Sequence, residues 1–229
     1  WRAIIGWDFT ADNVRACAQG VAQYLKSTGM ASHGLVVGYD TRFASEDFAA
    51  EVAQVSAANG IHTLLTSKAS PTPVVSYNVV HHHAGGAVII TASHNPPQWN
   101  GFKYKPEYGG SASQEVVDAL EREIAQAQDH EIPSLPLPEA RAQGLLEDIE
   151  PASPYLAHVG KLVDLTALQQ SGLKVAVDAM HGAGAGYLPQ LLAGLPGLTE
   201  LRSERNPIFP GMKQPEPVAH NLAPLSEYV

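Results

Sequence analysis

The sequence predicts an α/β protein: two consecutive α/β/α domains with mixed, mostly parallel sheets, of which the second is incomplete. Short apolar runs typical of buried strands alternate along the chain with segments whose apolar residues recur at helical spacing. The runs at 35–39 and 87–91 each stop at a polar segment, as parallel strands do at their carboxyl ends. A proline-rich stretch at 133–138 then divides the elements into two groups. We therefore expect a first domain over residues 1–140 and a second over residues 141–229.

The first domain begins with a helix. Val14, Cys17 and Val21 recur at helical spacing, and the helix is expected to end near Gly29. Cys17 lies on this apolar face, so we interpret it as a core residue rather than a nucleophile. The remaining elements expected here are strands at 35–39, 61–65 and 87–91, an extended piece at 101–105, and helices at 45–59, 74–82 and 113–129.

The second domain starts after an interruption. Because the βα pattern breaks there, we interpret residues 130–150 as a connection that crosses between the domains. The expected elements beyond it are a helix at 154–165, a strand at 173–178, a helix at 187–192, a strand at 198–201, a proline-rich loop at 206–217 and the start of a helix at 222–229. These elements are too few to bury both faces of a sheet.

Composition excludes several classes of function. The chain has 229 residues, a formal net charge of −9 and no cluster of basic residues, so nucleic acid is not expected as a partner. No apolar run is long enough for a membrane span, and no secretory signal is visible. A single cysteine fits a reducing, cytoplasmic setting. Since the chain starts at Trp1 rather than at a methionine, we expect a fragment or a processed chain.

The strongest candidate site is the turn after the strand at 87–91. It reads Thr-Ala-Ser-His-Asn-Pro-Pro over residues 91–97, at the end of a strand where α/β sheets bind ligands. The hydroxyl of Ser93 could serve as a nucleophile or a phosphoryl carrier, and Lys103 as a cation or a base. Asn95 and main-chain N–H groups of the turn could hold oxygens. These features favour phosphoryl transfer.

Two other interpretations of Ser93 remain. A Ser-His-Asp hydrolase is a poor match, because the pattern is not G-x-S-x-G and the adjacent His94 cannot easily turn back to deprotonate Ser93. An ordinary loop serine with satisfied hydrogen bonds is the other. The density of unusual residues at a strand end weakens it.

Three further patterns carry less information. The G-x-G-x-G turn at 182–186 could hold a phosphate, but its spacing favours tight turning and close packing. The three consecutive histidines at 81–83 cannot share one face of a helix, so they indicate a solvated helix end rather than a metal site. Asp40 and Arg42 follow a strand, and we expect Arg42 to tie down a loop through Asp40 or a neighbouring carboxylate.

The segment at 91–97, followed by Asn-Gly-Phe-Lys at 100–103, resembles the phosphoserine loop of the α-D-phosphohexomutases, the phosphoglucomutase/phosphomannomutase family. The motif is long and specific. Further resemblances to this family lie along essentially the whole chain, at 1–3, 37–42, 177–184 and 210–217.

The resemblance implies a role for each candidate residue. Ser93 would bear the phosphate, with His94 beside it in the catalytic loop. Lys103 would act near the transferred phosphoryl group as an acid/base or electrostatic stabiliser, and Arg2 would line the active site. We expect Arg2, Asn95 and Lys103 to bind substrate. In the family, the phosphoserine exchanges phosphate with a hexose 1- or 6-phosphate through a bisphosphorylated sugar, and Mg²⁺ bridges the serine phosphate and three aspartates.

The chain also departs from the family pattern. It lacks the family's D-G-D-G-D-R metal loop, its sugar-reading loop and its distal phosphate-binding loop. We therefore expect an N-terminal fragment, the first domain and most of the second, that is inactive without the missing C-terminal domains. Glucose or mannose phosphates are the expected substrates, since Thr91 and residues 97–104 resemble that branch more than the glucosamine branch. A non-catalytic, sugar-phosphate-binding or regulatory relative is the alternative.

Overall fold

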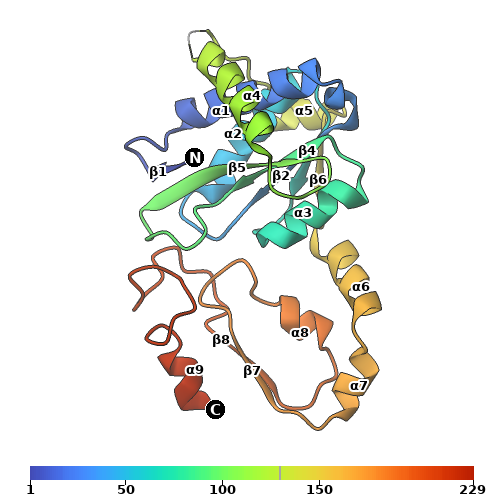
Figure 1. Ribbon diagram of the computed structural model, residues 1–229, viewed down its shortest axis with the longest axis vertical. Helices are drawn as coiled ribbons and strands as arrows, with labels where there is room; N and C mark the ends of the chain where they lie inside the picture. The colour runs from blue at the N-terminus through green and yellow to red at the C-terminus, as the bar shows by residue number, and fades with distance from the viewer. Residues whose placement is uncertain (129) are drawn as a thin grey trace.

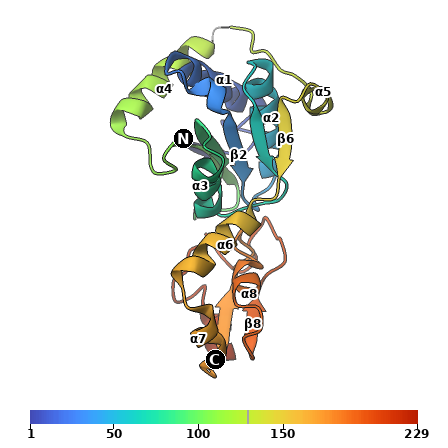
Figure 2. The ribbon, with the colours of Figure 1, turned by 90° about the vertical axis from the view of Figure 1, so that its right-hand side faces the viewer.

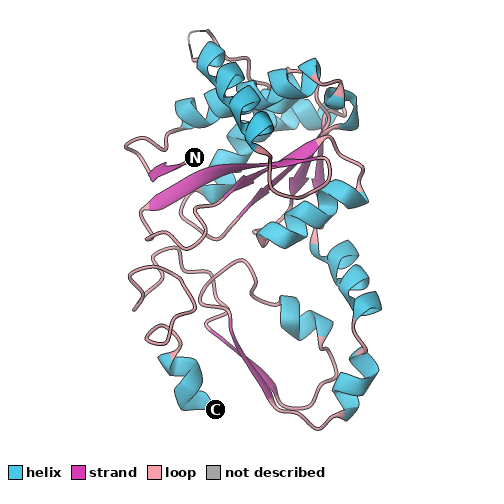
Figure 3. Cartoon of the chain, viewed as in Figure 1, coloured by secondary structure: helices cyan, strands magenta, loops and turns pink. Residues whose placement is uncertain are grey.

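The computed structural model describes residues 1–128 and 130–229. Figure 1 shows two lobes along the long axis, with the N-terminal residues in one and the C-terminal residues in the other. Figure 2, turned by 90°, shows the same division. Both lobes contain strands and helices (Figure 3), so the predicted α/β class is confirmed.

In the described part of the chain, the first lobe is built on a sheet of six strands in the order β1-β5-β4-β2-β3-β6. The strands are β1 (Arg2–Ile4), β2 (Leu35–Tyr39), β3 (Thr63–Thr66), β4 (Gly86–Ile90), β5 (Trp99–Pro106) and β6 (Leu146–Ile149). The strands β4, β2, β3 and β6 run parallel, whereas β5 runs antiparallel to both β4 and β1. The carboxyl ends of the parallel strands thus meet at one edge, which is where the serine loop follows β4.

Helices cover both faces of this sheet. They are α1 (Ala11–Ser27), α2 (Ser45–Ala58), α3 (Thr72–His81), α4 (Gln114–Ala127) and α5 (Leu137–Ala142), with a short 3₁₀ turn at Met30–His33. Figure 1 places α1, α2, α4 and α5 on one face and α3 on the other. The main core, which includes Leu25 and Val52, lies under the first group, and a smaller core around Val75 lies under α3. Apolar runs at β2 and β4 are buried from both sides, as predicted.

Residues 130–150 were predicted to be a connection between domains, and that interpretation is wrong for their second half. They contain α5 and β6, and β6 adds to the edge of the first sheet, where Leu146 pairs in parallel with Thr63. Only Leu146 and Ile149 of β6 are buried, with two acidic residues exposed between them. A strand of four residues with two apolar positions gives too weak a pattern to predict.

Other outcomes concern the edges of elements. The sheet extends to Ile149, while the predicted domain boundary at residue 140 stays a prediction. The strand β1 was not predicted, because three residues carry little periodicity. The helix α4 ends at Ala127, and Asp129, where we expected its end, lies outside the described residues.

The second lobe is smaller. Its elements are α6 (Ala152–Leu162), α7 (Leu165–Gln170), β7 (Val175–Asp178), α8 (Tyr187–Leu191), β8 (Leu198–Leu201) and α9 (Ala223–Tyr228). The strands β7 and β8 pair in parallel, and their residues are only partly buried. This agrees with the expectation of a unit with too few elements to cover a sheet.

Within the described residues, no helix has the length and apolar character needed to cross a membrane.

Candidate functional site

Ser93 lies in the loop that follows β4, and its backbone is in the left-handed region, with φ 58°. A residue with a side chain rarely adopts this conformation, and it persists where the surroundings enforce it. Part of the restraint is local. The N–H of Ser93 donates to Oγ1 of Thr91 at 3.0 Å, and the N–H of Asn95 donates to the carbonyl oxygen of Ala92 at 3.1 Å. The side chain of Ser93 is exposed, so its hydroxyl is presented to solvent on a held backbone.

The larger restraint comes from Arg42, whose side chain is 1% exposed. Its Nη1 donates to the carbonyl oxygens of Pro96 at 2.9 Å and Trp99 at 3.0 Å. Its Nη2 donates to the carbonyl oxygens of Ser93 at 2.9 Å and Asn95 at 2.6 Å. We call this set of contacts the Arg42 clamp. The predicted structural role of Arg42 is confirmed, but its main partners are carbonyl groups of the serine loop rather than carboxylates.

Asp40 contacts both the side chain and the main chain of Arg42. Its Oδ2 lies 3.4 Å from Nε of Arg42, and its Oδ1 accepts hydrogen bonds from the Arg42 N–H at 3.0 Å and from Oγ of Ser45 at 2.9 Å. Burial raises the pKa of Asp40. The hydrogen bonds from Thr91, Arg42 and Ser45 and the charge of Arg42 lower it and so oppose this shift. Nδ2 of the buried Asn100 also donates to Oγ of Ser45 at 2.9 Å. The polar groups behind the loop therefore form one connected network.

His94 is exposed beside Ser93. Its Nδ1 lies 3.4 Å from Oγ of Ser93, which is long for a hydrogen bond of this kind. Among the described residues, no carboxylate forms an ion pair with His94. A serine hydrolase needs a third group that orients the histidine, so this geometry does not favour the hydrolase interpretation.

Arg2 reaches the loop from β1. Its Nη1 donates to Oδ1 of Asn95 at 3.0 Å. Arg2 is paired with Gly101 across the two strands, and its neighbour Ala3 is buried in the main core. Because side chains alternate between the faces of a strand, Arg2 lies on the face opposite to that core.

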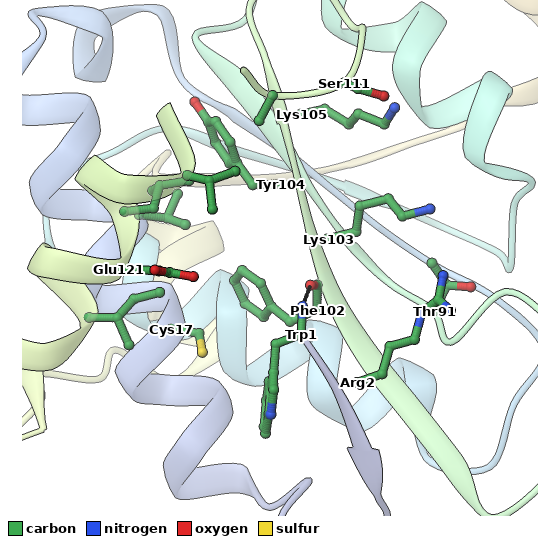
Figure 4. A pocket seen from close by; sticks show the side chains of 15 residues that line it. Trp1, Arg2, Cys17, Thr91, Phe102, Lys103, Tyr104, Lys105, Ser111 and Glu121 are labelled. Atoms are coloured by element: carbon green, nitrogen blue, oxygen red, sulfur yellow. Dashed lines mark hydrogen bonds between the residues drawn. The ribbon is translucent and has the colours of Figure 1, made fainter. Parts of the chain in front are cut away.

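Lys103 lies on the same face of the sheet as Arg2, since its neighbours Phe102 and Tyr104 enter the main core. Figure 4 shows the side chains of Arg2 and Lys103 extending on one side of β5. Burial lowers the pKa of Lys103, and the positive charges of Lys105 and Arg2 lower it further, while Asp40 opposes the shift.

Two of the hollows that border these residues also include Thr91 in their lining. One, of about 410 Å³, is lined by Arg2, Thr91, Lys103 and Lys105 together with apolar residues of α1 and α4 (Figure 4). The other, of about 260 Å³, is lined by Ser93 and first-lobe neighbours and, from the second lobe, by residues 179–180 and 182–184 together with Phe209 and Pro215. The structure thus joins Arg2 to Asn95 by a hydrogen bond, and Arg42 links the carbonyl groups of Asn95 and Ser93. Lys103 shares the larger hollow with Arg2.

The G-x-G-x-G turn holds a carboxylate of the chain itself. The N–H of Gly186 donates to both carboxylate oxygens of Glu200, at 2.9 and 3.1 Å. The helix that follows, α8, has five residues. The predicted tight turning is confirmed at Gly186, whose φ is 79°, but a Cβ at Gly184 would meet no heavy atom within 4 Å among the described residues, so close packing does not explain that glycine.

Residues of the types that bind metals are not gathered into one place among the described residues. In the described part of the chain, no three or more His, Cys, Asp or Glu side chains form a group that could hold a metal ion. The histidines at 81–83 are exposed at the end of α3, as predicted, and His81 stacks on Tyr77. The described residues do not make up a magnesium site by themselves.

Sequence reasoning missed several contributors. Thr91 was noted only for its resemblance, yet its hydroxyl accepts a hydrogen bond from the N–H of Ser93.

Two residues of the second lobe gave no signal in the sequence. They are Phe209, whose ring centroid lies 5.4 Å from the guanidinium carbon of Arg42, and Arg205, and both lie in an irregular segment. Asn100 could have been found, since it precedes Lys103 within the loop motif.

Comparisons with known proteins match both lobes of the chain to one family. Residues 1–131 match the phosphoglucomutase/phosphomannomutase α/β/α domain I, and residues 153–229 match domain II. The chain is 31% identical over 213 residues to a phosphoglucomutase of Staphylococcus haemolyticus, covering 89% of this chain and 38% of that protein. It is 28% identical to a phosphoglucomutase/phosphomannomutase of Thermococcus kodakarensis, covering 100% of this chain and 48% of the relative.

A solved structure agrees. A crystal structure from Thermus thermophilus, of a protein to which phosphomannomutase activity is ascribed, superposes with a TM-score of 0.88 at 32% identity. The match covers 100% of this chain and 50% of that one. The chain therefore spans at most about half the length of these relatives. The resemblance predicted from residues 91–103 is confirmed, and the chain belongs to the phosphoglucomutase/phosphomannomutase family.

Proposed function

We propose that this chain supplies the phosphoryl-carrying part of a hexose phosphomutase, which interconverts hexose 1-phosphate and hexose 6-phosphate through a phosphoserine and a bisphosphorylated sugar. The observation that carries the proposal is Ser93. Its hydroxyl is exposed, its backbone is left-handed, and its loop is clamped by a buried arginine at the carboxyl end of β4. The names of the relatives, phosphoglucomutase and phosphomannomutase, support the same reaction.

In the proposed transfer, the phosphoryl group leaves Oγ of Ser93 and bonds to a sugar hydroxyl. The hydroxyl gives up its proton to a base, and Oγ of Ser93 takes one up. Lys103 suits the acid/base role because its pKa lies below that of an ordinary lysine. The reverse transfer returns the other phosphate of the sugar to Ser93.

The remaining candidate residues would hold charge and position. Arg2 would balance the negative charge of the phosphate, and its hydrogen bond orients Asn95 so that the Asn95 amide group can donate to a sugar or phosphate oxygen. His94, with Nδ1 3.4 Å from Oγ, would face the oxygens of the phosphate once Ser93 carries it.

Mg²⁺ would neutralise phosphate charge when bound, with the Ser93 phosphate as one ligand. The described residues bring together no three carboxylates for it. We therefore propose that its protein ligands lie outside this chain, and that the 229-residue chain alone has no mutase turnover. Glucose and mannose phosphates as substrates, and a cytoplasmic location, stay predictions.

Intact-mass measurement tests the proposal. The chain is expressed together with the part of a family relative that follows its match to this chain, and the assembly is then incubated with glucose 1,6-bisphosphate and Mg²⁺. We expect a mass increase of one phosphoryl group that Ser93→Ala abolishes and that Ser27→Ala, an exposed serine at the end of α1, retains.

Each alternative predicts a different outcome. A serine that never takes up phosphate would support the sugar-phosphate-binding or regulatory relative. Labelling of Ser93 by a fluorophosphonate probe would support a hydrolase. Conversion of glucose 1-phosphate to glucose 6-phosphate by the 229-residue chain alone would overturn the proposed inactivity of the fragment.

A further inference from the structure

The Arg42 clamp is covered by a residue of the second lobe. The ring centroid of Phe209 lies 5.4 Å from the guanidinium carbon of Arg42, and Phe209 is 3% exposed. An aromatic face at this distance attracts the cation and excludes water from it. Phe209 has φ 45°, so its backbone is in the left-handed region as well. A phenylalanine in that conformation is held there by its surroundings.

A second contact from the same lobe fixes the turn that carries Arg42. Nε of Arg205 donates to the carbonyl oxygen of Thr41 at 3.1 Å, and its Nη2 donates to the carbonyl oxygen of Arg42 at 3.1 Å. Nη1 and Nη2 of Arg205 also reach the two carboxylate oxygens of Glu46 at 2.8 and 2.6 Å. One guanidinium thus joins the second lobe to the turn after β2 and to the first turn of α2.

Thr41 also donates a hydrogen bond to the second lobe. Its Oγ1 donates to the carbonyl oxygen of His181 at 2.9 Å, in a buried contact. The second lobe therefore contacts residues 41 and 42 in three ways. Arg205 donates to both of their carbonyl oxygens, the Thr41 hydroxyl donates to His181, and Phe209 covers the Arg42 guanidinium. The side chain of Arg42 then passes this restraint to four carbonyl oxygens in the segment 93–99.

From this chain of contacts we infer that Arg205 and Phe209 are positioning residues for Ser93: the second lobe sets the backbone of the serine loop through Arg42. The planar guanidinium of Arg42 must keep one orientation to reach carbonyls on both sides. Phe209 fixes the plane from its face, and Arg205 fixes the main chain from which the side chain starts. The catalytic consequence rests on the proposed function, whereas the structural coupling does not.

A purely structural role of Arg205, the docking of two lobes by an ion pair, makes a different prediction. The first lobe offers a matched control, because Arg141 forms an ion pair of the same kind with Asp148. Nε and Nη2 of Arg141 lie 2.6 and 2.9 Å from the two carboxylate oxygens, and both side chains are as exposed as those of Arg205 and Glu46. Arg141→Gln removes an equivalent pair without contact to the Arg42 turn.

Hydrogen exchange of the loop amides tests the inference on the 229-residue chain. The amides read are those of Ser93, Asn95 and Trp99, which donate to Thr91, Ala92 and Pro96. We expect Arg205→Gln to accelerate their exchange about fivefold and Arg141→Gln to leave it unchanged. Phe209→Leu should act as Arg205→Gln does, while Met212→Leu, in the same buried cluster as Phe209, should not.

Several results would overturn the inference. Unchanged loop exchange in both Arg205→Gln and Phe209→Leu is one, and equal acceleration by Arg141→Gln is another. A double-mutant cycle gives an independent test. In an Arg42→Lys background, Arg205→Gln should have a smaller effect on the loop, and full additivity would contradict transmission through Arg42.

Failure of the proposed function can be distinguished from failure of this inference. If loop exchange responds to Arg205→Gln while Ser93 never accepts phosphate, the coupling stands and the mutase proposal falls. If Ser93 does accept phosphate in the chain assembled with the missing domains, Arg205→Gln should lower the rate of phosphoryl transfer at saturating glucose 1,6-bisphosphate more than it raises KM. Arg205→Lys, which keeps the charge, should recover part of that loss.

Discussion

Nη2 of Arg42 donates a hydrogen bond of 2.9 Å to the carbonyl oxygen of Ser93, a residue 51 positions later in the chain. The donor starts from the turn after β2 and the acceptor from the loop after β4, which are neighbouring parallel strands. The geometry of the candidate phosphoryl carrier is therefore set by its neighbour in the sheet as much as by its own loop.

Arg42→Lys should destabilise the protein by about 3 kcal/mol. Lysine keeps the charge, but its single ammonium group cannot donate to the four carbonyl oxygens that the two Nη atoms of Arg42 reach. Urea unfolding with an unchanged m-value measures the loss. Arg15→Lys is the matched control: Arg15 pairs with Glu51 and Asp12 on a partly exposed surface, where we expect a change of less than about 1 kcal/mol. Equal effects of the two substitutions would contradict a special role for the clamp.

Gly101→Ala should destabilise the strand pairing beside the serine loop. A Cβ at this position would lie 2.5 Å from the carbonyl oxygen of Thr91 and 2.9 Å from that of Trp1, and both are backbone atoms that cannot turn away. We expect a loss of about 1–3 kcal/mol, measured by chemical unfolding. Gly184→Ala is the control, because a Cβ there meets no heavy atom within 4 Å among the described residues. A neutral Gly101→Ala would show that β1 is free to move.

Lys105→Gln should raise the pKa of Lys103, since burial, Lys105 and Arg2 are the causes that lower it. In the wild type, the pKa of Lys103 is lower in the folded chain than in the unfolded chain. The unfolded chain therefore binds more protons between the two values, and stability rises with pH across that window. Lys105→Gln should flatten this rise. NMR titration of the lysine side chains gives the pKa, and Lys26→Gln, which removes a lysine bonded to Asn59, should leave it unchanged.

Cys17 should resist alkylation in the folded protein. Burial raises the pKa of its thiol to about 11, so little thiolate is present at neutral pH. We expect slow modification by N-ethylmaleimide in buffer and rapid modification in urea, both followed by intact mass. Rapid labelling of the folded chain would show that the face of α1 opens readily.

The order of the elements and the serine loop were predictable because each rests on local information. Strands β2 and β4 are continuous apolar runs that end at polar segments, and helices α1 and α3 begin at residues suited to helix starts. Ser93, with its neighbours, stands out in the sequence because its motif is contiguous. The family assignment follows from the same segment and is confirmed by the matches to both domains.

What the sequence could not supply is the set of contacts made over long separations. Arg42 was expected to hold a loop, but nothing near it indicates that the loop is the one containing Ser93. Phe209 lies in a proline-rich segment whose pattern predicts neither strand nor helix. The edge strands β1 and β6 have three and four residues, and their position depends on pairing rather than on periodicity.

The contacts of Arg42 also imply an order of assembly. During synthesis Arg42 leaves the ribosome before Ser93, whereas Arg205 follows 163 residues after Arg42. The clamp on the serine loop can therefore close while the second lobe is still being made, but the groups that hold Arg42 arrive late. A nascent chain in that interval would carry the serine on a loop with incomplete support. The loop would gain its full support only when the segment that contains Arg205 and Phe209 docks on the first lobe.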